Sequence, residues 1–119
     1  SISRFLERIA DHSVKIAKNV LLIDFQKIDK RIFSDISKAS IFSLKMLDIS
    51  LDAWLNKSLN LANENINSVK KLIDTCENIY LKLDMVVEFS VPIGYIIESI
   101  RRTGEYSVDI SEVIINMLI

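Results

Sequence analysis

A segment near the start of the chain returns near its end, and this repeat constrains the fold more than any other feature. Residues 6–18 (LERIADHSVKIAK) resemble residues 100–112 (IRRTGEYSVDISE). Superimposed, the segments match at Arg8 and Arg102, Asp11 and Glu105, Val14 and Val108, and Ile16 and Ile110. Two copies of one pattern indicate two copies of one structural unit. The apolar spacing in both copies is that of a helix.

The composition favours one all-helical domain. The 119 residues are long enough for a core, half of them are hydrophobic, and the chain has only two glycines and one proline. So few turn-forming residues over this length predict a few long helices. The 15 basic and 16 acidic residues are interleaved along the sequence, so we expect no nucleic-acid partner.

The sequence also bounds the cellular context. The single cysteine, Cys76, rules out an internal disulfide, and no segment resembles a secretory signal. The apolar runs 20–23 and 113–119 are shorter than the roughly 20 residues that a membrane-spanning helix needs. We therefore expect a cytoplasmic protein without a transmembrane segment. Because the chain opens inside a helical pattern, we also expect it to be a piece of a longer protein.

Hydrophobic periodicity predicts four helices, at about 3–22, 34–56, 60–88 and 91–117, within a single domain spanning 1–119. Ser3, Ser34 or Asp35, and Ser90 are the expected N-caps, and Pro92 fits a first helical turn. Four helices joined by short links indicate an antiparallel four-helix bundle.

The second predicted helix carries a seam with alternating spacings of four and three, formed by Leu44, Leu47, Leu51 and Trp54. A reversal is expected at 56–60, although no glycine marks it. A single helix through 34–88, in an elongated and domain-swapped partner, is the alternative. In the last helix, Gly104 indicates close helix approach, and its equivalent in the first copy is the small Ala10. We expect the two repeat helices to cross there.

The repeats resemble a known signature. The stretch 5–17 (FLERIADHSVKIA) is similar to the motif of PhoU proteins, the phosphate-uptake regulators, and 98–112 is similar to its second copy. The motif residues are Glu7, Arg8, Asp11, Arg102 and Glu105. Members of that family consist of two three-helix units, each ending in a motif helix. The resemblance matches this chain to the last helix of the first unit followed by the whole second unit, in a PhoU-like bundle.

The resemblance implies a non-catalytic regulator that restrains phosphate import and phosphate-starvation signalling. Its partners would be a phosphate-transporter ATPase or a signalling protein. Some family members bind iron or zinc clusters through pairs of acids on neighbouring helices. In this chain Arg101 stands at one such ligand position, and Val69 and Ile73 stand where the preceding helix normally offers acids.

Four carboxylates are the candidate metal ligands, in pairs four residues apart: Glu7 with Asp11, and Glu105 with Asp109. Asp48 and Asp52 have the same spacing. Carboxylates on one helix face suit a hard cation, and the resemblance implies iron or zinc. The alternative is that these acids form ion pairs with neighbours such as Arg8, Lys15 and Arg102.

No catalytic motif accompanies these residues. His12 is the only histidine, Cys76 lies on an apolar seam, and no phosphate loop or dinucleotide fingerprint occurs. We therefore expect no enzymatic activity. Two hypotheses remain: a PhoU-like regulatory binding module, or a structural helical module that oligomerises within a larger assembly.

The resemblance implies that the first helix belongs to a missing first unit, so that the surface it normally covers lacks its partner. Together with the apolar carboxyl end, this predicts a homodimer with the first and last helices near the two-fold axis. The candidate interface residues are Trp54, Ile115 and Leu118.

Overall fold

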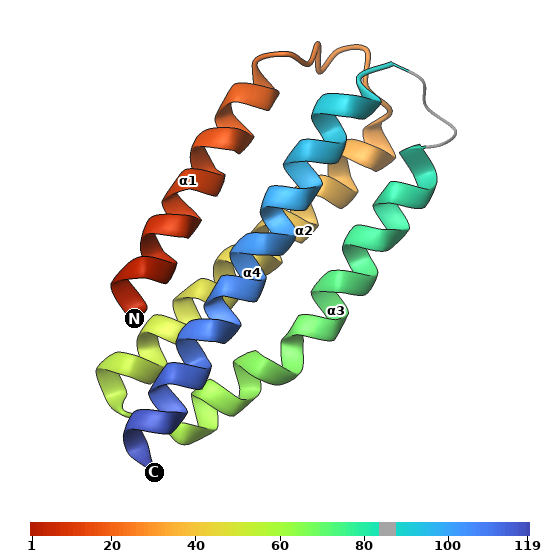
Figure 1. The fold of residues 1–119 in the computed structure, drawn as a ribbon. Coiled ribbons are helices and arrows are strands. Elements are labelled where there is room, and N and C mark those ends of the chain that lie inside the picture. The colour runs from red at the N-terminus through yellow and green to blue at the C-terminus, as the bar shows by residue number, and fades with distance from the viewer. Residues whose placement is uncertain (84–87) are drawn as a thin grey trace.

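The computed structural model describes residues 1–83 and 88–119 of the chain and contains four long helices. These are α1 (Ile2–Val20), α2 (Lys30–Asn56), α3 (Leu59–Leu83) and α4 (Ser90–Leu118). Consecutive helices run in opposite directions in a body measuring 49 × 23 × 17 Å (Figure 1). The described residues include no strand, and the predicted all-α antiparallel four-helix bundle is confirmed.

Helix α2 begins four residues earlier than predicted because Asp29 caps it. The Asp29 carboxylate accepts hydrogen bonds from the backbone N–H groups of Arg31 (2.7 Å) and Ile32 (3.4 Å). These groups have no partner inside a helix, so a side-chain acceptor fixes the first turn. The prediction that Ser34 or Asp35 caps this helix is wrong. Asp35 instead forms a 2.6 Å ion pair with Lys82 on α3.

The reversal between α2 and α3 lies where it was predicted. Lys57 adopts the left-handed conformation (φ 50°), and the backbone N–H of Ser58 donates to the carbonyl of Ala53 at 2.9 Å. The Ser58 hydroxyl then accepts from the N–H of Leu61 at 3.1 Å, which caps α3. The alternative of one unbroken helix through 34–88 is therefore wrong.

Helix α4 begins at Ser90, with Phe89 in the capping position at φ 63° and Pro92 in the first turn. Ser90 is thus the first helical residue and not the cap, and Ser3 likewise lies inside α1. The third helix was predicted to end at Glu88, which lies in a turn. Residues 84–87 of that predicted helix are outside the described part of the chain.

Helix α4 is the centre of the bundle. The backbones of α1, α2 and α3 all come close to it, and α2 also packs on α3. The backbone of α1 comes close to α4 and to no other described helix. Figure 1 shows α1 set apart from α3 on the other side of α4. This arrangement leaves the flanks of α1 uncovered.

The buried seam of α2 lies one residue before the predicted one. It consists largely of small residues: Ala39, Ser43, Met46, Ser50 and Ala53. Leu44 and Trp54, which belong to the predicted seam, are 54% and 42% exposed. Short side chains let α2 approach α4 closely, and the Ser43 hydroxyl donates to the Ile100 carbonyl at 2.9 Å.

Gly104 is buried at a close helix approach, but not at the expected one. A Cβ atom at this position would clash with the side chain of Leu72 on α3 and lie 3.4 Å from the sulfur of Met46 on α2. Ala10, its equivalent in the first repeat, is exposed on α1. The prediction that both small residues mark the crossing of the two repeat helices is wrong, because Gly104 faces α2 and α3.

A buried asparagine ties α3 to the same face of α4. The Asn65 amide donates to the Ser107 carbonyl at 3.2 Å and to the Ser111 hydroxyl at 3.0 Å. A buried amide without partners would destabilise the fold, so these bonds fix the register of α3 on α4.

We predict opposite effects of alanine at the two glycines of α4. Gly104→Ala gains about 1 kcal/mol of helix propensity but overpacks a site where Leu72 is fully buried, at a cost of roughly 1–3 kcal/mol. We expect a net loss of about 1 kcal/mol in the free energy of unfolding. Gly94→Ala meets only Tyr80, at 4.0 Å, and should stabilise. Urea denaturation measures both, and a stabilised Gly104→Ala variant would contradict the packing described here.

Candidate functional site

The two repeated segments pack against each other, antiparallel, along α1 and α4. The His12 Nδ1 atom lies 3.0 Å from the Ser99 hydroxyl, and the rings of Phe5 and Tyr106 are 6.1 Å apart. The α4 residues that face α1 include Thr103, Tyr106 and Ile110, which are the repeat equivalents of Ile9, His12 and Ile16 on α1. Equivalent faces in antiparallel contact are related by an approximate local two-fold axis.

Each repeat helix has a second face, beside the one through which α1 and α4 contact each other. The two repeats differ in the burial of this second face. On α4 this face is buried against α2 and α3 and consists of Gly104, Ser107, Val108 and Ser111. On α1 the equivalent residues are Ala10, Ser13, Val14 and Ala17, and all four are exposed. The first repeat therefore presents to solvent a small and apolar face that the second repeat uses for helix packing.

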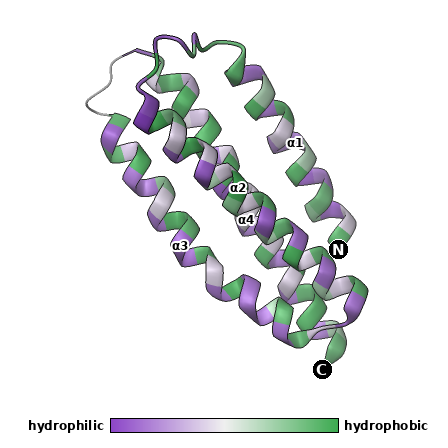
Figure 2. Cartoon of the chain, turned by 180° about the vertical axis from the view of Figure 1, so that it is seen from behind, coloured by the Kyte–Doolittle hydropathy of each residue, from purple (hydrophilic) through white to green (hydrophobic). Residues whose placement is uncertain are grey.

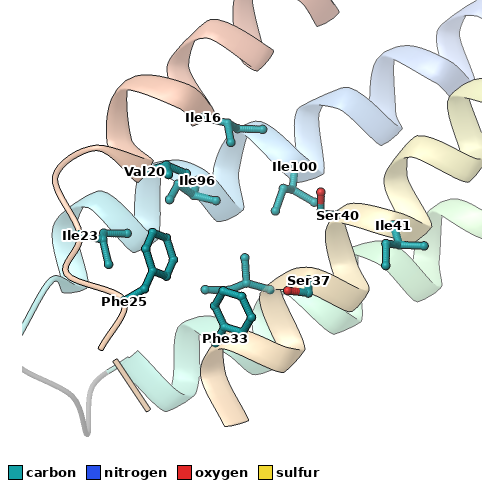
Figure 3. Close-up of a pocket in the computed structure, with 11 residues that line it drawn as sticks. Ile16, Val20, Ile23, Phe25, Phe33, Ser37, Ser40, Ile41, Ile96 and Ile100 are labelled. Atoms are coloured by element: carbon teal, nitrogen blue, oxygen red, sulfur yellow. The ribbon is translucent and has the colours of Figure 1, made fainter. Parts of the chain in front are cut away.

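This exposed face borders an apolar groove between α1 and α2, with α4 as its floor. Ile16 and Val20 form the α1 wall, Ile96 and Ile100 form the floor, and the other side chains come from α2 and the connection before it (Figure 3). The groove has a volume of about 390 Å³, within the range of small-molecule sites. It continues along α1 past Ile9 and Ser13 towards Leu44.

The groove lining is hydrophobic apart from the hydroxyls of Ser37 and Ser40. Ile41 on its rim is 67% exposed, an unusual position for an isoleucine. Seen from behind, α1 carries hydrophobic positions along its whole length (Figure 2). The sequence pattern did not predict this groove, since Phe25 and Phe33 were assigned to the connection between helices. These two aromatic residues and the isoleucines of the same link were the available signal.

The acidic motif residues of the first repeat lie on the outer surface of α1. Glu7, Arg8 and Asp11 are exposed. Helical periodicity puts Glu7 and Asp11 on the side of α1 opposite Ile9 and Ile16, which pack on α4. The structure therefore does not bring Glu7 and Asp11 together with Glu105 and Asp109.

The acids of the second repeat lie in an ion-pair network along α4. Arg101 contacts Glu98 through two 2.8 Å hydrogen bonds and lies 3.9 Å from Glu105. Arg102 pairs with Glu105 at 3.2 Å, and its guanidinium lies 4.5 Å from the centre of the Tyr106 ring. Glu105 therefore forms ion pairs, as the alternative to metal binding predicted.

These residues do not fit the metal cluster that the resemblance implies. Two arginines occupy the surroundings of Glu105, and the pKa of Asp109 is raised by burial and by Glu112, which disfavours the ionised form that binds a cation. Val69, at a family ligand position, packs against the core. Within 1–83 and 88–119, no three His, Cys, Asp or Glu side chains converge as metal ligands would.

Burial sets the chemistry of the two nucleophilic groups near the network. It raises the pKa of the Cys76 thiol to about 11 and that of the Tyr80 hydroxyl to about 12. Both groups are therefore protonated at neutral pH, and the thiolate that would act as a nucleophile is scarce. Tyr80 donates to the Gly94 carbonyl at 3.2 Å, a structural contact between α3 and α4.

The predicted interface residues gather at the end of the bundle where α2 and α4 finish. Trp54 is exposed and lines a depression of about 260 Å³ with Lys57, Ile114, Met117 and Leu118. Ile115 and Leu118 are half-buried against the part of the core that contains Ile110 and Ile114. The exposed side chains at this end are thus largely apolar.

None of the helices in the described part of the chain is long and apolar enough to cross a membrane. No family model, curated protein or solved structure matches this chain. The groove, the exposed face of α1 and the apolar end are therefore the features from which a function must be argued.

We predict that His12 titrates below its ordinary pKa of 6.5. Burial is the largest cause, followed by Lys15 and Arg102, with Glu98 and Asp11 opposing. A lowered pKa in the folded state means that the unfolded chain binds the proton more readily. The free energy of unfolding should therefore fall as the pH drops through about 6.5 and stay level above it.

The measurement is an NMR titration of the imidazole, which is unambiguous because the chain has one histidine. Lys15→Gln should raise the pKa of His12, whereas Lys18→Gln, one turn further along the exposed side of α1, should leave it unchanged. A His12 pKa at or above 6.5 in the parent protein would show that the contact with Ser99 does not desolvate the ring.

Proposed function

We propose that this chain is a non-catalytic regulatory module of the PhoU type, which acts through contacts with other proteins. One observation carries the proposal: the small and apolar face of the first repeat is exposed beside an apolar groove, whereas the equivalent face of the second repeat is packed. Exposed apolar surfaces of this kind mark protein contacts.

The chemistry of the surface supports binding over catalysis. The groove offers hydrocarbon and two serine hydroxyls, and the charged motif residues Glu7, Arg8 and Asp11 stand exposed on the same helix. Such a surface can bury a partner's apolar side chains, and the charges on the outer side of α1 can select among partners. By resemblance, the partner is a cytoplasmic phosphate-transporter ATPase or signalling protein, and the outcome is restraint of phosphate import.

The test is expression of this chain in a bacterial strain that lacks its own phosphate-uptake regulator. We expect a phosphate-starvation reporter, constitutively active in that strain, to fall severalfold towards its repressed level. Ala17→Arg, which places a charge on the exposed face of α1 without disturbing the core, should abolish the effect. Asn78→Arg, on the exposed side of α3, is the matched control. An unrepressed reporter at equal protein level would refute the PhoU assignment.

The apolar end of the bundle favours the second hypothesis, a helical module that oligomerises. Trp54, Leu55, Met117 and Ile119 are all exposed there, around a depression lined by both helices. A tryptophan beside a hollow is a common anchor of protein interfaces. A second copy can bury this surface through a symmetric contact.

We predict a homodimer that forms through this end, detectable by sedimentation velocity at tens of micromolar. Trp54→Arg should shift the protein to monomer without loss of helicity, because Trp54 is 42% exposed and outside the packed seam. The same change at a distant exposed site, Leu81→Arg on α3, should leave the dimer intact. A monomer at all concentrations would eliminate this candidate.

A further inference from the structure

Helix α1 is attached to the rest of the bundle through a single helix interface. Its backbone comes close to α4 and to no other described helix, whereas α2, α3 and α4 each contact the other two. The buried residues of α1 are Ile2 and Ile9, whereas α4 has buried residues along its whole length. If α1 separates, the mutual contacts of the other three helices remain. Helix α1 is therefore the element that leaves the bundle at the lowest cost in free energy.

The connection between α1 and α2, residues 21–29, has the form of a hinge. Its turn is closed by two hydrogen bonds to Asp24: the N–H of Lys27 donates to the Asp24 carbonyl at 3.0 Å, and the N–H of Gln26 donates to its carboxylate at 3.1 Å. Ile23 before the turn and Ile28 after it are buried. Straightening the turn at 24–27 therefore breaks local hydrogen bonds and leaves each isoleucine with the helix next to it.

The same connection exposes apolar side chains. Leu21 is 85% exposed, Leu22 is 65% exposed and Phe25 is 40% exposed. Removing such side chains from water is favourable, and an apolar cluster on a surface marks a contact. Because these residues belong to the hinge, the contact that they indicate is one between two hinges.

We propose that two copies of this chain exchange α1, so that α1 of each copy packs on α4 of the other. The exchanged helix contacts are those of the monomer, so they change the free energy little. In such a dimer both connections pass between the copies, close to the two-fold axis, where Leu21 and Leu22 of one copy meet those of the other. This burial opposes the entropy lost on association, and the balance depends on protein concentration.

The exchange builds the candidate site from two chains. In the exchanged dimer, Ile16 and Val20 of one copy form the α1 wall of a groove whose floor and α2 wall belong to the other copy. A partner bound in that groove then contacts both chains. The inference does not rest on the PhoU-type function. It also differs from a dimer formed through the end at Trp54, which leaves each α1 on its own chain.

The experiment cross-links two single variants to each other. Lys15→Cys on α1 and Tyr95→Cys on α4 place thiols at exposed positions that line one depression between these helices. The native Cys76 is buried, and its pKa is raised to about 11, so it stays unreactive. A tagged Lys15→Cys chain and an untagged Tyr95→Cys chain are refolded together at tens of micromolar and treated with a short bismaleimide. We expect a product that contains one chain of each kind.

Two controls accompany this measurement. The double variant Lys15→Cys/Tyr95→Cys tests the reach of the reagent, because it links within one folded chain. Mixing the two single variants after each has folded separately should give little mixed product, since α1 is then already packed on its own α4.

Further variants test the role of the hinge. Leu21→Arg/Leu22→Arg should lower the yield of the mixed product about tenfold, because the leucines no longer bury one another at the axis. Leu81→Arg on α3, where the leucine is 68% exposed, is the matched control and should leave the yield unchanged. Trp54→Arg should also leave it unchanged, which separates exchange from association through the end of the bundle.

The inference is overturned if the co-refolded chains give no mixed product while the double variant links within one chain. A mixed product that disappears in Trp54→Arg would also overturn it, because the chains would then meet through the end of the bundle. So would a yield that Leu21→Arg/Leu22→Arg leaves unchanged, because the hinges would then not form the contact.

Discussion

The packing of α2 and α3 on one small-residue face of α4 is the constraint on which the rest of the structure depends. Gly104 lies beneath Leu72 and Met46, and Ser107 and Ser111 of α4 hold the buried amide of Asn65. Short side chains bring the three helix backbones close together, and the hydroxyls among them must then find partners inside the core. This contact fixes the rotation of α4 about its own axis. It thereby decides which face remains for α1.

Helix α1 packs on the face of α4 that α2 and α3 leave uncovered. The sequence repeat explains why the rest of α1 stays exposed. Both repeat helices have an apolar arc too wide for a single neighbour. In α4 one half of that arc packs on α1 and the other half on α2 and α3. In α1 only the first half is used, so Val14 is 52% exposed although its equivalent Val108 is buried. The groove therefore arises because the two repeat helices share one apolar pattern, whereas only α4 has neighbours that cover all of it.

Much of this fold follows from the sequence, and the errors have physical causes. Scarce glycine and proline, with Pro92 at the last boundary, predicted the four helices and their order. The seam of α2 was misplaced by one residue because leucine outranks serine in hydropathy, whereas close helix packing selects Ser43 over Leu44. The cap at Asp29 was missed because Ser34 and Asp35 are equally good cap residues and only the tertiary position of the chain chooses among them.

The candidate site was harder to predict than the fold because it consists of the face of α1 that no other helix covers. The spacing of Arg102 and Glu105 was sufficient to favour an ion pair, and the structure shows one. The groove, in contrast, depends on the absence of a neighbour beside α1, which no local pattern records. The repeat makes this face recognisable once the structure is known, because residues that are buried on α4 have exposed equivalents on α1. A surface built from residues of the kind that pack helices together has a geometry already suited to a helix.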